Sequence, residues 1–119
     1  EYEIFLDGTN VQTGSAQWGS AAKAEIPYSN LNMGKRQIGG YFHAGLSDEI
    51  AIWHTALSAS DTAALYNSGV PGDLSSLSPN GWWRMGDNDG GTGTTVTDQG
   101  SGSNDGTLNG ATFSTDVPS

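Results

Sequence analysis

The segment that most constrains the fold is residues 46–53, which read Leu-Ser-Asp-Glu-Ile-Ala-Ile-Trp. Alternate side chains of an extended segment share a face, so Leu46, Asp48, Ile50 and Ile52 would all point the same way. Three of them are apolar, and a lone carboxylate in such a row is costly unless a cation or several donors meet it. The segment therefore predicts a core strand of a sandwich and a candidate ion site at Asp48.

Residues 59–68 predict the one convincing helix. Ser58 is a good N-cap, Asp61 makes a capping-box-like start, and Gly69 suits the position just after the helix. The other regular stretches are short, are separated by glycine-rich turns, and lie at residues 2–6, 81–86, 94–97 and 106–113. Many short strands with one short helix, and without βαβ alternation, indicate an all-β antiparallel sandwich.

Composition narrows the classes of function. The 119 residues suffice for one domain, and the absence of cysteine excludes a disulfide framework. Four basic residues face 13 acidic ones, for a formal charge of −9, which disfavours a phosphate-binding nucleic-acid surface and favours divalent cations. No apolar run is long enough to cross a membrane. Because the first residue already lies in an alternating strand pattern, we expect the sequence to be a portion of something longer.

Residues 39–69 resemble the closing segment of laminin-G-like, concanavalin A-like jelly rolls, which usually reads F-x-G-x-I-D-E-V-x-I-x-N-x-A-L-S-x-x-E-I-x-x-L-Y. Ser47 stands where Ile is usual, and His54 stands where Asn is usual. Residues 3–8, Glu-Ile-Phe-Leu-Asp-Gly, are similar to the W-x-L-Y-V-D-G strand and turn upstream of it. The resemblance implies that residues 1–69 are the closing half of a jelly roll.

Residues 81–110 resemble the opening segment of the same family, although here they come last, after a connector at 70–80 and before a polar tail at 114–119. A closing segment followed by Trp-Trp-Arg-Met-Gly-Asp resembles structural proteins of marine phages. The jelly roll would then be incomplete or permuted. Residues 81–113 would pair beside residues 46–53 in the same sandwich or complete that of a neighbouring subunit.

Calcium is the metal that the resemblance implies. Family members often hold it near the D-x-S-G-x-G-N-x-G loop and the Asp of the I-D-E-V strand, and hard oxygen ligands suit it. By position, the implied ligands are Asp48, Asp98 and Asn104, with the carbonyls of Gly100 and Gly102. Asp48 would then join residues 46–53 to the 98–106 loop. The alternative is that Asp98 and Asp105 are ordinary turn formers, because such side chains hydrogen-bond their own backbone.

Catalysis is not expected. Cleavage of a glycan requires two carboxylates that face each other across the sugar, whereas adjacent Asp48 and Glu49 would point to opposite faces of a strand. Tryptophans could stack on sugar rings or pack inside the protein. Trp18, in a loop, is the candidate glycan platform. Trp82 and Trp83 alternate, so at most one is expected in the core of one sheet, and packing is favoured for both.

Together with these resemblances, the sequence thus predicts a non-catalytic structural or attachment module of a larger assembly, namely a phage virion protein. Its role would be that of a decoration, fibre or attachment protein of the virion. Its partners would be other subunits, with a homo-oligomer expected and glycans as further ligands, but no nucleic acid and no membrane. The alternative is a calcium-dependent carbohydrate-binding or adhesion module of a secreted bacterial protein, which would be extracellular.

Overall fold

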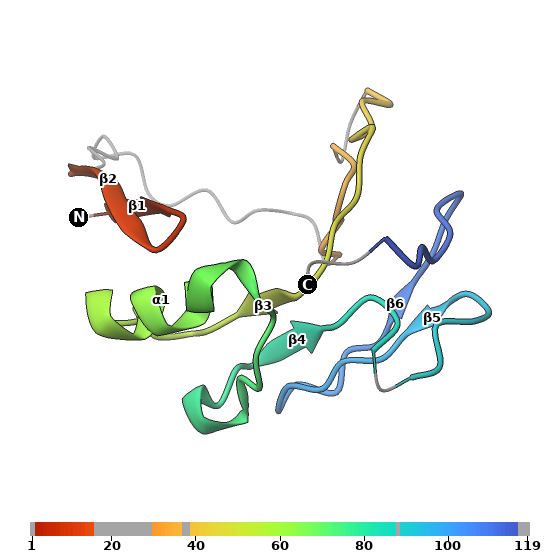
Figure 1. Cartoon of the computed structure of the whole chain (residues 1–119). Coiled ribbons are helices and arrows are strands. Elements are labelled where there is room, and N and C mark those ends of the chain that lie inside the picture. Colours follow the sequence, from red (N-terminus) through yellow and green to blue (C-terminus); the bar gives the residue numbers. More distant parts are fainter. Residues whose placement is uncertain (1, 16–29, 37–38, 88, 117–119) are drawn as a thin grey trace.

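The computed structural model describes residues 2–15, 30–36, 39–87 and 89–116, and its strands pair in three small antiparallel sheets (Figure 1). The pairs are β1 (Tyr2–Leu6) with β2 (Thr9–Gly14), β3 (Ile50–Ile52) with β4 (Gly81–Trp83), and β5 (Thr95–Val96) with β6 (Gly106–Thr107). A β-rich antiparallel fold with one short helix is therefore confirmed. The jelly-roll sandwich stays a prediction.

The helix forms where the sequence predicts it. In α1 (Ala59–Tyr66), the Ser58 hydroxyl accepts the Asp61 N–H, and the Asp61 carboxylate accepts the Ser58 N–H, each at 3.1 Å. The helix ends two residues earlier than predicted because Asn67 already adopts a left-handed conformation, with φ of 41°. Two 3-10 turns follow, η1 (Asn67–Gly69) and η2 (Ser75–Leu77). Among the described residues, no helix has the length and apolar character to cross a membrane.

The β1–β2 hairpin packs on the helix through its turn. A Cβ at Gly8 would lie 2.9 Å from the Cβ of Tyr66, so the turn approaches the helix as closely as glycine permits. The apolar side chains of β1 gain little from this contact, since Ile4 remains 47% exposed and Leu6 63% exposed. The hairpin is therefore anchored at its turn, while the face that carries Ile4 and Leu6 remains open.

The strand predicted at 46–53 is shorter in the structure. Glu49 has a φ of 49°, in the left-handed region, and this interrupts the alternation before β3 begins. Leu46 is consequently 61% exposed, so the predicted core row that it shares with Asp48 does not form. Likewise, the strand predicted at 81–86 ends at Trp83, and Met85 has a φ of 49°.

The interior gathers around β4. The buried hydrophobic side chains of the described residues are Trp82, Trp83 and Val96, which are 4%, 7% and 4% exposed. The expectation that both tryptophans pack inside the protein is thus confirmed, because different segments cover the two faces of β4. Trp83 lies over Gly81, where a Cβ would come within 2.4 Å of its ring, and its Nε1–H donates to the Asn104 carbonyl at 2.9 Å.

Candidate functional site

Asp98 joins the 98–104 loop to β4. Its Oδ1 accepts the backbone N–H groups of Trp82 and Gly100, and its Oδ2 accepts the N–H of Asn104, each at 2.8 Å. The residue is only 7% exposed. The bonds to Gly100 and Asn104 are those of a turn former, and the bond to Trp82 adds a link sixteen residues away in the chain. Asp98 therefore holds the loop against the edge of β4 that β3 leaves open.

The electrostatics of Asp98 favour its charged form. Burial pushes the pKa of this carboxyl upward, but the three backbone hydrogen bonds from Asn104, Trp82 and Gly100 outweigh burial and leave it below the usual 3.8. The buried carboxylate is thus ionised at neutral pH and stabilised by N–H dipoles. Within the described part of the chain, Oδ1 accepts from two donors and Oδ2 from one.

Gly100 and Gly102 lie where the loop meets the backbone of Asn80. The Gly102 N–H donates to the Asn80 carbonyl at 2.7 Å. A Cβ at Gly100 would lie 2.7 Å from the Asn80 carbonyl oxygen and 2.8 Å from the Gly81 Cα. The two glycines thus permit the loop backbone to pack closely against the backbone of Asn80 and Gly81.

We expect Gly100→Ala to lower the free energy of unfolding by about 2 kcal/mol, because rigid backbone atoms occupy the space of the new methyl group. Gly72→Ala is the matched control, since the nearest atom to its Cβ is 3.9 Å away and its φ is not positive. Urea denaturation of both variants tests this expectation. Equal stabilities of the two variants would contradict it.

Asp48 lies in a different charged setting from the one predicted. It is half-buried, and its Oδ1 accepts the N–H of Glu49 at 2.9 Å. Burial raises the pKa of Asp48, the Glu49 N–H lowers it, repulsion by Glu49 and Asp87 raises it, and attraction by Arg84 lowers it, with a raised pKa as the result. The Asp48 side chain thus hydrogen-bonds its own neighbour, and its role as the link to the 98–106 loop stays a prediction.

Glu49, which the sequence reasoning left without a role, lies just before β3 and links this position to β4. Its Oε1 lies 2.8 Å from the Arg84 Nε, and its Oε2 accepts the indole N–H of Trp82 at 2.7 Å. The Arg84 guanidinium lies over the Trp82 ring, 5.1 Å from its centroid, and reaches Asp87 at 3.2 Å. The register of the two strands explains this contact. Ala51 is opposite Trp82, and two residues further along the same register Glu49 is opposite Arg84.

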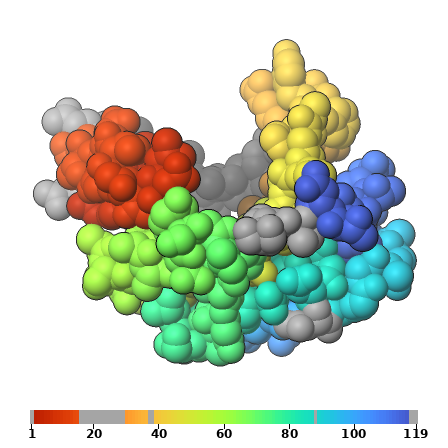
Figure 2. Space-filling model, in the orientation of Figure 1, coloured from red at the N-terminus to blue at the C-terminus, as the bar shows by residue number. Residues whose placement is uncertain are grey.

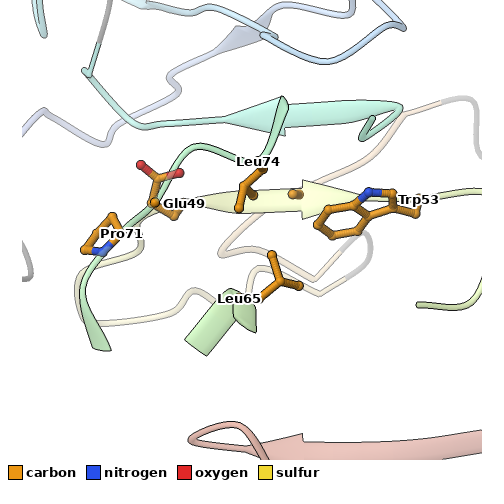
Figure 3. A pocket seen from close by; sticks show the side chains of 7 residues that line it. Glu49, Trp53, Leu65, Pro71 and Leu74 are labelled. Atoms are coloured by element: carbon orange, nitrogen blue, oxygen red, sulfur yellow. The ribbon is translucent and has the colours of Figure 1, made fainter. Parts of the chain in front are cut away.

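A cavity of about 190 Å³ lies beside this link, between β3, α1 and the connector (Figure 3). Trp53, Leu65, Pro71 and Leu74 supply apolar walls, and the Glu49 side chain lies at one end. The Glu49 carboxylate is already engaged by Trp82 and Arg84. The cavity therefore combines apolar walls with a carboxylate that is committed to structure.

The metal and glycan predictions have different outcomes. The structure brings Asp98, Asn104, Gly100 and Gly102 into one loop, and a Cβ at Gly102 would lie 2.6 Å from the Asn104 Nδ2 and 3.5 Å from the Asp98 Oδ2. In the described ranges, no group of three or more His, Cys, Asp or Glu side chains could hold a metal. Calcium binding therefore stays a prediction. Trp18 lies outside the described residues.

The chain was compared with protein-family models, with curated proteins and with solved structures, and none of the three comparisons gave a match. The arguments for function therefore come from the residues and their geometry.

The calcium prediction has a direct thermal test. One millimolar calcium should raise Tm by roughly 5 °C, as expected for a ligand with a dissociation constant of about 0.1 mM that binds only the folded chain. Chelator should reverse the shift, and Asn104→Ala should abolish it if this side chain is a ligand. An unchanged Tm in calcium would contradict the prediction.

Proposed function

We propose that the chain is a non-catalytic structural or attachment module of a larger assembly, and that the assembly is a phage virion. The observation that carries the proposal is the open apolar face of the β1–β2 hairpin, where Tyr2, Ile4 and Leu6 alternate along one strand and are all exposed. A two-stranded hairpin is marginally stable by itself in water. Exposed contiguous apolar surface is characteristic of interaction sites.

The small interior supports the same proposal. The buried hydrophobic residues of the described chain belong to β4 and β5, and no sheet there has more than two strands. The hairpin contributes nothing to that interior, so burial of its apolar face requires contacts from elsewhere. Association would supply this burial and stabilise the folded chain by mass action.

The non-catalytic part of the proposal is supported by the way the enclosed carboxylates are used. Those of Asp98 and Glu49 accept hydrogen bonds from backbone or side-chain donors of the protein itself. Among the described residues that line the cavity beside Trp53 and Leu65, Glu49 is the one that carries a carboxylate. The virion is proposed because residues 39–87 resemble structural proteins of marine phages.

The test is the mass of the 119-residue chain in solution, measured by size-exclusion chromatography with light scattering while circular dichroism monitors the fold. The proposal predicts a stable oligomer. A well-folded monomer over the whole concentration range would contradict it. A glycan array with and without chelator tests the secreted adhesion alternative, which requires chelator-sensitive binding of a sugar.

A further inference from the structure

Charge is unevenly distributed along the chain. Residues 30–47 contain none of the 13 acidic residues but carry Lys35 and Arg36. Removing these two positive charges from the net charge of −9 leaves −11 on the remainder. Arg84 is held by Glu49 and Asp87. The free cationic surface of the described chain is thus concentrated in one segment.

That segment is a projecting arm, defined here as residues 34–36 and 39–43. The Arg36 N–H donates to the Tyr41 carbonyl at 3.0 Å, and the His43 N–H donates to the Gly34 carbonyl at 2.7 Å. Lys35 pairs with Phe42 as an isolated antiparallel bridge. The arm, in orange and yellow, extends away from the small sheets (Figures 1 and 2).

Two cation–aromatic pairs cover the arm. The Lys35 Nζ lies 5.7 Å from the centroid of the Phe42 ring, and the Arg36 Cζ lies 5.6 Å from the centroid of the Tyr41 ring. The aromatic residues are among the most exposed of the chain, at 67% for Tyr41 and 70% for Phe42. Aromatic residues together with arginine are enriched in protein interfaces. The arm thus presents a surface that is both apolar and positive.

The β1–β2 hairpin has the complementary character. Its exposed apolar residues are Tyr2, Ile4, Leu6 and Val11. The same hairpin carries the exposed acidic residues Glu3 and Asp7 and no basic residue. Tyr2, Ile4 and Leu6 lie on one face of β1, Glu3 lies on the other face, and Asp7 lies in the turn. In this two-stranded sheet of the described chain, apolar and negative side chains therefore border the outer edge of β1 from both faces.

We infer that the arm of one copy of this chain docks on the β1–β2 hairpin of a second copy. The inference rests on the proposed function and names the partner in that assembly. The arm and the hairpin lie apart from each other in Figures 1 and 2, and the apolar side chains of both are exposed, so the arm does not cover the hairpin of its own chain. Docking of unlike surfaces is heterologous, and it generates a ring or an open fibre.

A charge exchange tests this pairing. The arm variant is Lys35→Glu/Arg36→Glu. The hairpin variant is Glu3→Lys/Asp7→Asn, in which asparagine tolerates the left-handed conformation of Asp7, with φ of 48°. Each variant alone places like charges together and should associate at least about tenfold more weakly than the unmodified chain. An equimolar mixture should regain association to within about threefold, because each acidic arm now meets a basic hairpin.

Sedimentation equilibrium measures the association constants of the variants and of their mixture, and far-ultraviolet circular dichroism checks that each variant is folded. Asp116→Lys is the control for a charge reversal elsewhere on the exposed surface, and it should leave association unchanged. If a double variant is unfolded, Lys35→Glu and Glu3→Lys replace the pair in the same mixing experiment.

The outcomes separate this inference from the proposed function. The arm–hairpin pairing is overturned if both variants associate as strongly as the unmodified chain, or if mixing them does not restore association. Either result leaves the proposed structural role intact. A folded monomer of the unmodified chain at every concentration overturns both. Weaker association of each variant alone, with association restored on mixing, supports both the arm–hairpin pairing and the proposed function.

Discussion

Asp98→Ala is expected to lower the free energy of unfolding by about 4 kcal/mol. The substitution removes the acceptor of three backbone N–H groups, and a buried donor left unsatisfied costs roughly 1–3 kcal/mol. A loss of this size is a large part of the 5–15 kcal/mol that is typical of whole domains. Thermal and urea unfolding measure it. Asp116→Ala, an exposed residue with the same change of charge, should stay within about 0.5 kcal/mol of the unmodified chain.

Asp98→Asn distinguishes the bonds to the two oxygens. The amide oxygen can still accept the N–H groups of Trp82 and Gly100, whereas the amide nitrogen would face the N–H of Asn104. The expected loss is therefore intermediate, about 2 kcal/mol. An Asn variant as unstable as the Ala variant would show that charge matters here more than the number of acceptors.

The stability that Asp98 provides also depends on pH. Because the pKa of the folded carboxyl lies below its unfolded value of 3.8, the contribution is fully present above that value. It is lost as pH falls through the lower, folded pKa. The difference in stability between the unmodified chain and the Asn variant should therefore shrink below about pH 3.8. A difference that stays constant into strong acid would contradict the lowered pKa.

Glu49→Ala is expected to cost about 3 kcal/mol. It leaves the indole N–H of buried Trp82 without its acceptor and removes the ion pair to Arg84, whose side chain is 18% exposed. Glu49→Gln should cost about half as much, since its one oxygen can serve only one of the two donors. Urea denaturation near pH 7 measures these differences.

Asp48→Ala is the matched control for Glu49, because the two carboxylates are adjacent. Burial and the charges of Glu49 and Asp87 raise the pKa of Asp48, so ionisation of this carboxyl is less favourable in the folded chain than in the unfolded one. We therefore expect its removal to be neutral or mildly stabilising. An Asp48 variant that is less stable than the Glu49 variant would contradict this expectation.

The sequence was sufficient to predict the features that depend on neighbouring residues. Ser58 and Asp61 form the capping box, and the helix begins at the expected residue. The Asp7-Gly8 turn and the paired strands around it also agree with the local pattern. These features follow from hydrogen bonds and backbone preferences within three or four residues, which a single sequence contains.

The link between Glu49 and Arg84 could not be predicted from the sequence, because it depends on backbone conformation and on strand register. Strict alternation from Leu46 places Asp48 in the core row, but the left-handed conformation of Glu49 interrupts that alternation. Glutamate rarely adopts positive φ, so no local sequence pattern predicts that the strand is interrupted at Glu49. The partner at Arg84 then follows from a pairing between segments more than thirty residues apart.

The structural role of the glycines in the 98–104 loop also could not be predicted from the sequence. Gly100 and Gly102 suit a calcium loop, but their spacing also suits a loop that packs against the Asn80 backbone. Only the contact distances distinguish close packing from ordinary turn chemistry. The buried Trp83 ring over Gly81 has the same origin, since it depends on which segment covers each face of β4.

The central claim is that β4 and the Asp98 loop fold within one chain, whereas the β1–β2 hairpin is buried only in the assembly. Hydrogen exchange followed by mass spectrometry, at protein concentrations below and above association, tests it most directly. The account predicts that amides of residues 80–84 and 98–104 are protected at both concentrations, and that those of β1 become protected only on association. Amides of β1 that are as well protected as those of β4 in the monomer would contradict it.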